Sequence, residues 1–288
     1  IKRKAGRGKG MKRNEEKMQC LRRQMEGYAK KDVIVAFSGG VDSSLLLKLA
    51  CEAALKSNRK VYAVFLHTAM HPSGDAQSAK RVAEEIGADF RILKIDELET
   101  AQIADNPTDR CYRCKRHLFE RIQGEAAKLQ AGWIMDGTNA DDLKAYRPGI
   151  RAIRELGIIS PLADACITKE EVRLLAKEYG ISVAKKPSTP CLATRFPYGT
   201  RLTYADMRKV EEAESYLKEL GIYNVRVRVH GDIARIEVDC QAMDVVMEYK
   251  KEIAEYLKSL GYVYIALDLE GFRSGSMDQN IEAHDRED

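Results

Sequence analysis

The chain has 288 residues, of which 44% are hydrophobic and 32% are charged, and its formal net charge is +4. This length allows two domains with sizeable cores, and no apolar run is long enough to cross a membrane. The positive charge is confined to residues 1–31, which hold 12 Lys or Arg against 3 Asp or Glu; residues 32–288 hold 36 against 41. A basic arm can contact nucleic acid or be a solvated helix. Because zinc-finger and RNP-type aromatic motifs are absent, we do not expect nucleic-acid binding.

Seven cysteines occur, mostly as scattered single residues, and no signal peptide is visible. An odd number of cysteines without a leader favours reduced thiols over a disulfide framework. The sequence therefore predicts a cytoplasmic protein.

Short apolar strands alternate with helical patterns through the first two thirds of the chain. In chain order, we expect strands at 33–37, 61–66, 90–95 and 133–135, and helices at 43–55, 74–86, 115–129, 150–156 and 168–179. Thr168 and Glu171 have the spacing of a capping box at the last of these helices. Alternating continuous strands and helices predict an α/β fold with a doubly wound parallel sheet that is covered on both faces.

The pattern changes after the proline-rich segment KKPSTPCLATRFPYGTR. Beyond it, VRVRVHG and IARIEVD alternate strictly between apolar and polar residues, as half-buried strands do. We also expect helices at 204–220 and 243–260 and a strand at 262–267. The predicted domains are a basic arm or first helix (1–31), the sheet domain (32–200), a smaller α+β domain for substrate binding or oligomerisation (201–270) and a tail (271–288).

The segment SGGVDSS follows the first strand directly and opens the next helix. Glycines let backbone N–H groups approach an anion, and a helix N-terminus favours negative charge at the same spot. The segment therefore predicts phosphate binding, although it lacks the lysine of a Walker A loop. The expected nucleotide-binding residues are Ser38, Gly39, Gly40, Asp42, Ser43 and Ser44.

Three further positions complete the predicted nucleotide site. Asp42 can hold Mg²⁺ beside phosphates or cap the helix that follows it. Gly137 lies in the loop DGTNADD (136–142), which follows a strand of the same sheet and should border the nucleotide. Thr68, at the end of the second strand, is a candidate contact for adenosine.

Cysteines at two places predict a reactive or metal-binding site. CYRCK places Cys111 and Cys114 just before an expected helix, and Cys191 lies in the proline-rich segment. The pair can bind zinc with His117 as a further ligand, can act as a redox pair, or can join Cys191 in holding a [4Fe–4S] cluster. The spacing leaves these alternatives open. Nearby cations, namely Lys185, Lys186 and Arg195, favour the thiolate form of Cys191.

SGGVDS resembles the PP-loop of the ATP pyrophosphatases, whose fold is adenine nucleotide alpha hydrolase-like. CYRCK, DGTN-x-DD, KPS-xx-C-LATRFPYGT and VRVRVHG then extend the resemblance, from about residue 32 to 268, to the LarE family of sulfurtransferases. The resemblance implies that ATP is cleaved between its α and β phosphates and that AMP is transferred to a carboxylate. Sulfur then enters pyridinium-3,5-dicarboxylate mononucleotide on the way to the nickel-pincer nucleotide cofactor of lactate racemase.

The resemblance also implies roles for individual residues. Cys191 gives up its own sulfur in single-cysteine members, whereas three-cysteine members carry a [4Fe–4S] cluster. The presence of Cys111 and Cys114 makes this chain similar to the cluster-bearing kind. Lys115 and Arg195 are candidates for steadying the developing negative charge, or are ordinary exposed cations.

Arg226 and Arg228 alternate with valines on an expected strand, so both should point to one face while Val225, Val227 and Val229 face the core. Two guanidinium groups on one face suit a substrate phosphate. Alternatively, the two arginines lie on a solvated strand face and bind no ligand.

The expected cofactors are ATP, Mg²⁺ and the cluster, and the expected partners are a small-molecule nucleotide substrate, a sulfur donor (sulfide or its carrier) and further copies of the chain in a homo-oligomer. Two alternatives remain. A tRNA-thiolating PP-loop enzyme with a cluster would use the basic arm for RNA, and its affinity would fall steeply with salt. A non-catalytic nucleotide-binding module would bind ATP without releasing pyrophosphate.

Overall fold

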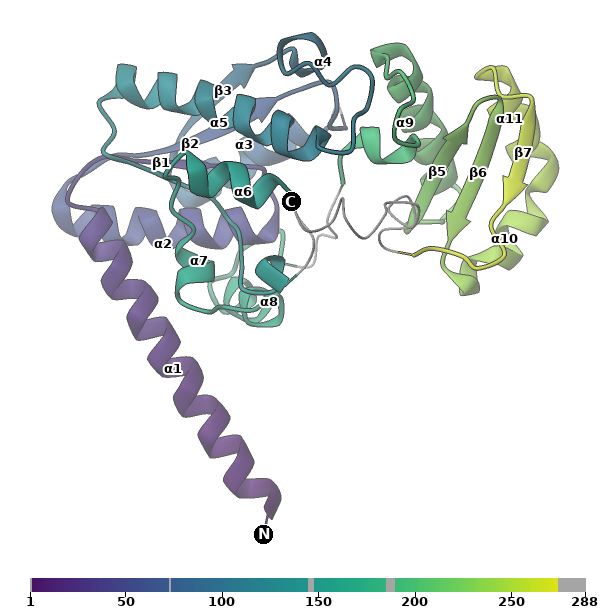
Figure 1. Cartoon of the computed structure of the whole chain (residues 1–288). Coiled ribbons are helices and arrows are strands. Elements are labelled where there is room, and N and C mark those ends of the chain that lie inside the picture. Colours follow the sequence, from purple (N-terminus) through teal and green to yellow (C-terminus); the bar gives the residue numbers. More distant parts are fainter. Residues whose placement is uncertain (1, 73, 145–147, 185–189, 274–288) are drawn as a thin grey trace. The chain divides into compact units, whose positions relative to one another are not determined.

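The computed structural model describes residues 2–72, 74–144, 148–184 and 190–273, with side chains described from residue 15 onwards (Figure 1). The chain divides into two compact units. The first consists of Ile1–Thr68, Ser73–Glu97 and Cys111–Ser188, and the second of Ala69–Pro72, Leu98–Arg110 and Thr189–Asp288. Within the described residues, no helix is both long and apolar enough to span a membrane.

The first unit contains a parallel four-stranded sheet with the order β3-β2-β1-β4. Its strands are β1 (Val33–Ala36), β2 (Val61–His67), β3 (Asp89–Lys94) and β4 (Trp133–Met135). Its main helices are α1 (Lys2–Tyr28), α2 (Val41–Ser57), α3 (Asp75–Ile86), α5 (Arg110–Leu129), α6 (Pro148–Glu155), α7 (Pro161–Asp164) and α8 (Lys169–Glu178). Because β1 lies between β2 and β4, the strand order reverses at the carboxyl end of β1, where ligands bind in such sheets.

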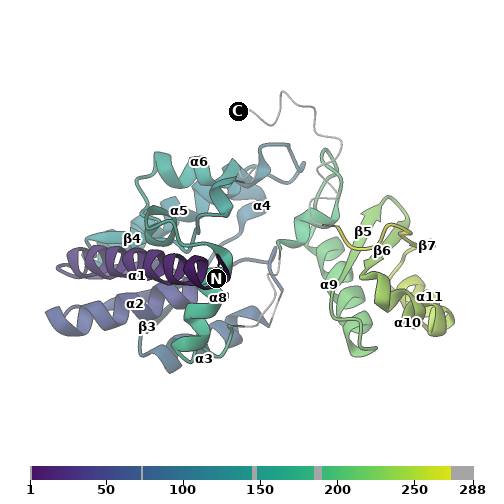
Figure 2. The ribbon, with the colours of Figure 1, turned by 90° about the horizontal axis from the view of Figure 1, so that it is seen from below.

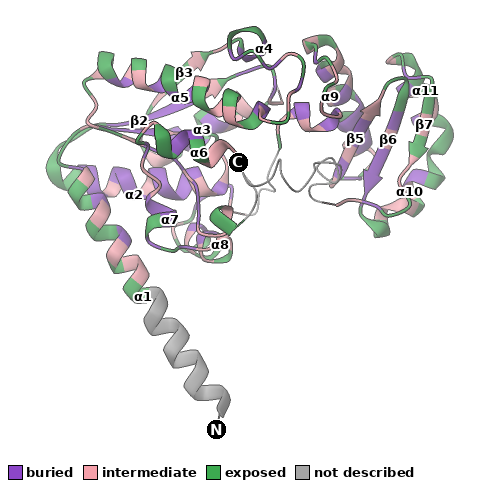
Figure 3. Cartoon of the chain, in the orientation of Figure 1, coloured by how far each residue is buried: buried purple, intermediate pink, exposed green. Residues whose placement is uncertain are grey.

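Both faces of this sheet are covered, as the strand pattern predicts. Val33, Val35 and Phe37 face a core that α1, α2, α3 and α8 complete. Ile34, on the opposite face of β1, and Val64 of β2 pack with α5 and α6. The buried strands appear in Figure 3, and the expected doubly wound α/β sheet is confirmed.

The second half of α1 belongs to this core, although the sequence analysis separated residues 1–31 from the sheet domain. Leu21, Met25 and Ala29 are buried at intervals of four residues, which is one face of a helix. Figure 2 shows α1 lying alongside α2. Lys17 adds an ion pair with Glu171 of α8 at 2.8 Å.

The second unit contains a three-stranded sheet with the order β5-β6-β7, in which β5 pairs antiparallel and β7 parallel to β6. Its elements are β5 (Val225–His230), β6 (Ile233–Val238), β7 (Tyr264–Leu267), α9 (Tyr204–Glu219), α10 (Met243–Glu248) and α11 (Lys250–Ser259), together with the short helix α4 (Glu97–Thr100), of which Glu97 lies in the first unit. Val225 and Val227 are buried against these helices, and Val229 is half-buried.

Three details differ from the sequence prediction. The helix expected at 115–129 begins at Arg110, because the Arg110 N–H bonds back to the Pro107 carbonyl and no helix breaker follows. CYRCK therefore lies within the helix rather than before it. The helix expected at 243–260 bends at Tyr249 (φ −95°, ψ 20°) into α10 and α11. The two compact units also cut the chain differently from the expected domain ranges, since residues 69–72 and 98–110 lie with the C-terminal part.

The capping box at α8 is confirmed. Thr168 Oγ1 accepts a hydrogen bond from the Glu171 N–H at 3.3 Å, and the Glu171 carboxylate accepts one from the Thr168 N–H at 2.7 Å. These two bonds satisfy N–H groups that have no acceptor within the helix.

We predict that Gly39→Ala destabilises the chain by about 1–3 kcal/mol, because Gly39 has φ +70° and an added Cβ would lie 2.9 Å from Ala79 Cβ. Gly124→Ala is the matched control. Gly124 lies in the middle of α5 with open space around it, so alanine there should stabilise by about 1 kcal/mol. Urea unfolding measures both changes, and equal effects of the two substitutions would contradict the prediction.

Candidate functional site

The loop between β1 and α2 forms the first part of the site. Gly40 precedes the first helical residue with an extended backbone and no side-chain cap, so Asp42 does not cap the helix, contrary to the bland alternative. Ser43 Oγ donates to the Gly40 carbonyl at 3.1 Å and accepts from the Ser38 N–H at 3.3 Å. Ser44 Oγ donates to the same carbonyl at 2.8 Å. The hydroxyl groups thus fix the loop, while the N–H groups that begin α2 have no acceptor within the helix.

Asp42 lies at the centre of a polar cluster that joins three segments. Its Oδ1 accepts a hydrogen bond from the buried Asn139 Nδ2 at 3.1 Å, and its Oδ2 forms a close ion pair with Lys169 Nζ. Asn139 comes from the loop after β4, and Lys169 is the first residue of α8. The Lys169 N–H is in turn bound by Asp141 at 2.9 Å. Asp42 is therefore a pre-positioned carboxylate beside an ammonium group.

Gly137 lies where the loop after β4 presses against the start of α2. A Cβ at this position would be 2.9 Å from the Ser43 backbone nitrogen, so only glycine fits. The preceding residue, Asp136, is buried and accepts hydrogen bonds from Thr138 and Ser160, both at 2.6 Å. The segment DGTNADD thus borders residues 38–44, the predicted phosphate loop, as its position after a sheet strand predicts.

Thr68 is buried at the carboxyl end of β2, the strand beside β1.

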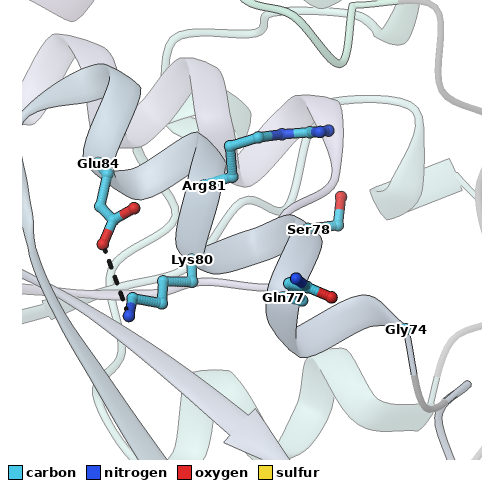
Figure 4. A pocket seen from close by; sticks show the side chains of 6 residues that line it. All are labelled: Gly74, Gln77, Ser78, Lys80, Arg81 and Glu84. Carbon is cyan, nitrogen blue, oxygen red and sulfur yellow. Dashed lines mark ion pairs between the residues drawn. The ribbon is translucent and has the colours of Figure 1, made fainter.

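A separate hollow lies on α3, and Figure 4 shows its Lys80–Glu84 ion pair (3.7 Å) on one side of the helix and Ser78 and Arg81 on the other. The residues lining this hollow are Gly74, Gln77, Ser78, Lys80, Arg81 and Glu84. None of them is a predicted site residue.

Cys111 is the second residue of α5 and is exposed, and Cys114 is the fifth and is half-buried. Lys115 follows them, and its ammonium group lies 4.9 Å from the centre of the Phe119 ring. Lys115 is therefore half-buried on its own helix rather than an ordinary exposed cation.

Cys191 lies in the second unit, immediately before the short 3₁₀ helix Leu192–Arg195, and is half-buried. Arg195 is only 1% exposed and forms a two-pronged ion pair with Glu214 of α9, at 2.7 and 3.0 Å. Its remaining nitrogen donates to the Pro190 and Cys191 carbonyls at 3.3 and 3.2 Å. Arg195 is thus neither an exposed cation nor an uncompensated charge; it fixes the backbone at Cys191.

Arg226 and Arg228 occupy the same strand face but have different surroundings. Arg228 is buried, pairs with the fully buried Glu237 at 3.0 Å and donates to the Thr194 carbonyl at 2.7 Å. Arg226 is half-buried, lies 5.1 Å from the Phe272 ring centre and has no ion pair among the described residues. Burial and the neighbouring Arg195 charge lower the pKa of Arg226. Arg226 is therefore the guanidinium group that an added anion would stabilise.

Cys51 is the cysteine that is buried in the core of the first unit. Burial raises the pKa of Cys51 in α2 to about 11, so this thiol stays protonated at neutral pH and acts as a small apolar residue. All seven cysteines lie within the described residues, and none forms a disulfide. Lys185 and Lys186, expected to favour the Cys191 thiolate, lie outside the described residues.

The described part of the chain contains no group of three or more His, Cys, Asp or Glu side chains arranged to hold a metal ion. Cys111 and Cys114 belong to the first unit and Cys191 to the second. None of the three thiols is fully buried, and thiolates are the ligands of [4Fe–4S] clusters, which ordinarily take four. Asp42 likewise supplies the oxygen ligand that Mg²⁺ prefers.

Comparisons with known proteins show the family of the chain. Residues 14–117 match the family model of NAD synthase. Pyridinium-3,5-bisthiocarboxylic acid mononucleotide synthase from Lactiplantibacillus plantarum is 38% identical over 249 residues, which cover 86% of this chain and 90% of that protein.

The chain belongs to the LarE family.

Two uncharacterized proteins are similar to it as well. One, from Synechocystis sp., is 36% identical over 92% of this chain and 98% of its own length. The other, from Methanocaldococcus jannaschii, is 33% identical over 86% of this chain and 94% of its own length. The similarity to the synthase from Lactiplantibacillus plantarum confirms the expected ATP-dependent sulfurtransferase family.

Sequence reasoning missed several residues of this LarE-family site. Asn139 is part of the quoted DGTNADD loop but was given no role. Lys169 follows the capping residue of α8, a position that nothing in the sequence marks as close to Asp42. Glu214 and Glu237, the buried partners of Arg195 and Arg228, read as ordinary polar positions of a helix and a strand. Because Glu237 alternates with apolar residues in IARIEVD, as Arg235 does, the sequence gives no signal that its side chain is buried.

We predict that Lys169→Met slows pyrophosphate release from ATP by about 10²–10³-fold, because the substitution removes a positioned cation beside Asp42 and the phosphate loop. Lys144→Met is the control. Lys144 pairs with Asp141 of the loop after β4, but its side chain is 73% exposed. A coupled pyrophosphate assay compares the two. Unchanged release by the Lys169 variant would contradict a role for this ammonium group.

Proposed function

We propose that the chain adenylates a carboxylate of pyridinium-3,5-dicarboxylate mononucleotide with ATP and converts it to a thiocarboxylate, as a step in nickel-pincer nucleotide biosynthesis. The observation that carries the proposal is the similarity, over 86% of the chain, to a synthase named for the bisthiocarboxylic acid mononucleotide. The phosphate loop and the Cys191 turn support it, since the reaction needs an anion site for pyrophosphate and a sulfur-bearing residue.

Adenylation is the task of the first unit. A carboxylate oxygen of the substrate attacks the α-phosphorus of ATP, the bond from that phosphorus to the bridging oxygen breaks, and pyrophosphate leaves. The loop Ser38–Ser44 and the N-terminus of α2 hold the departing anion, and Lys169 stabilises its charge. Mg²⁺ bound at Asp42 would neutralise phosphate charge and orient the leaving group.

Sulfur transfer is the task of Cys191. Its thiolate attacks the acyl carbon and the bond to AMP breaks, which gives a thioester on the chain. Removal of the Cys191 Cα proton then breaks the Cβ–S bond, leaving a thiocarboxylate product and dehydroalanine. A [4Fe–4S] cluster on Cys111, Cys114 and Cys191 would instead supply an open position for external sulfide and allow repeated turnover.

We further propose that sulfide or a sulfide carrier is the sulfur donor. We also propose that the chain works as a homo-oligomer, and light scattering of the purified protein measures its molecular mass.

Arg226 is the proposed contact for the substrate phosphate. Arg195 pairs with Glu214, and Arg228 and Arg235 share Glu237, whereas Arg226 has no ion pair among the described residues. A phosphate would balance the charge of Arg226. Arg228, included in the sequence prediction for the same role, already has an ion-pair partner in Glu237.

The two arginines should therefore respond differently to substitution. Arg226→Met should raise the KM for the mononucleotide by about 10- to 100-fold, since a charge-assisted hydrogen bond is lost, with little change in stability. Arg228→Met should lower the free energy of unfolding by about 1–3 kcal/mol, because the buried Glu237 loses this partner but keeps its ion pair with Arg235 at 3.0 Å. Steady-state kinetics and urea unfolding together separate the outcomes; similar behaviour of both variants would refute the assignment.

The function itself is tested with anaerobically purified protein, ATP, Mg²⁺ and the dicarboxylate mononucleotide. Pyrophosphate and thiocarboxylate should form together, and Cys191→Ala should abolish the thiocarboxylate. The metal content separates the two routes: about four irons with acid-labile sulfide, lost in Cys111→Ala, supports the cluster. Absence of iron together with a mass loss of about 34 Da at Cys191 after one turnover supports the sacrificial route. ATP binding without pyrophosphate release would refute the enzyme assignment.

A further inference from the structure

The backbone around Cys191 is held by side chains from a distant part of the chain. Asn106 is fully buried, and its Nδ2 donates to the Phe196 and Pro197 carbonyls at 3.3 and 2.7 Å. Its own carbonyl accepts the Gly199 N–H at 2.9 Å. One side chain and one carbonyl group of Asn106 therefore bind three positions of the segment that follows the cysteine.

Arg110 extends this contact to the turn itself. The guanidinium group is 3% exposed and donates to the Ala193 carbonyl at 3.2 Å and, closely, to Asn106 Oδ1. Asn106 thus orients Arg110, and the Tyr198 ring covers the guanidinium group at 5.5 Å. Both residues lie in the short stretch Leu98–Arg110, which belongs to the same compact unit as Cys191.

Asn106 has the backbone conformation that such a role requires. Its φ is +49°, a left-handed conformation that most residues avoid and asparagine tolerates. The conformation is sparsely populated outside glycine and persists where the surroundings determine it. Here the buried side chain is anchored at both ends, by Arg110 and by the two carbonyls.

We propose that Asn106 and Arg110 are positioning residues for sulfur transfer, which hold the peptide planes after Cys191 so that its side chain keeps one direction. This inference deepens the proposed function, because it takes Cys191 as the sulfur-bearing residue. Peptide planes whose carbonyls are bound cannot rotate freely, and displacing a reacting atom by about 1 Å can slow a reaction 10²-fold. Neither residue has a role in the adenylation step proposed above, so adenylation should not depend on them.

Two substitutions test the role. Asn106→Asp keeps tolerance of the left-handed backbone and the acceptor for Arg110 but loses both donors to the carbonyls. Arg110→Met removes the donor to Ala193, and Arg110→Lys restores a donor of similar reach. Arg201→Met is the control, because the Arg201–Asp105 pair (3.2 Å) joins the same two stretches of chain but is exposed.

We expect Asn106→Asp and Arg110→Met to lower the rate of thiocarboxylate formation at saturating substrate by about 100-fold. ATP–pyrophosphate exchange and the substrate KM should change less than about threefold, and Arg110→Lys should recover most of the rate, whereas Arg201→Met should match the unsubstituted chain. Equal losses of exchange and transfer, or no loss of either, would overturn the proposal.

The proposal remains testable if the proposed function fails. The rate at which iodoacetamide alkylates Cys191, measured by peptide mass spectrometry against pH in the presence of an iron chelator, needs neither ATP nor substrate. A slower rate or shifted pH profile in both variants supports positioning even when the unsubstituted chain forms no thiocarboxylate. Identical rates and profiles in all variants would refute it.

Discussion

The hydrogen bond from Asn139 to Asp42 depends on the strand order of the parallel sheet. β1 and β4 are neighbours although about a hundred residues separate them, so the loops at their carboxyl ends meet. The first loop supplies the glycines and serines for an anion, and the second supplies the amide that orients Asp42. The start of α8 brings Lys169 to the same carboxylate. The polar cluster around Asp42, where we propose that a metal–nucleotide complex binds, is therefore a consequence of topology.

The second unit uses buried charge for a different purpose. Burying Arg195, Arg228, Glu214 and Glu237 carries a large desolvation penalty, which ion pairs and further hydrogen bonds must offset. The spare donors of these arginines bind backbone carbonyls of the Cys191 turn, so the ion pairs determine the shape of a loop. Side chains of the short 3₁₀ helix after Cys191 and of β5 thereby hold the backbone carbonyls of Cys191 and Thr194.

Sequence reasoning predicted the regular parts of the molecule well because their patterns are local. The parallel strands, the capping box of α8 and the alternation in β5 each follow from side chains within a few residues of one another. The phosphate loop was equally recognisable. Leu21, Met25 and Ala29 have the four-residue spacing of a buried helix face. The many basic residues around them favoured the interpretation as an arm separate from the sheet domain.

What the sequence could not predict are contacts between distant polar residues. A lysine at the start of a helix looks the same whether it faces water or Asp42. Arg195 was interpreted as a cation for the reaction, whereas its charge is balanced by Glu214, 19 residues away. In the VRVRVHG strand, Arg228 pairs with Glu237 and Arg226 has no ion pair among the described residues. The spacing of the two arginines does not predict which of them has the carboxylate partner.

The second unit is assembled from three separate stretches of chain, and this arrangement has a consequence for synthesis on the ribosome. Arg110 and Asn106 are made 83 to 91 residues before the carbonyls that they bind. At typical elongation rates of about 5–20 residues per second, these polar groups wait about 4–18 seconds for their partners. Residues 69–72 and 98–110 are thus made before the rest of their unit, which starts at Thr189. The turn after Cys191 also uses the side chain of Arg228, so it can be completed only after residue 228 has been made.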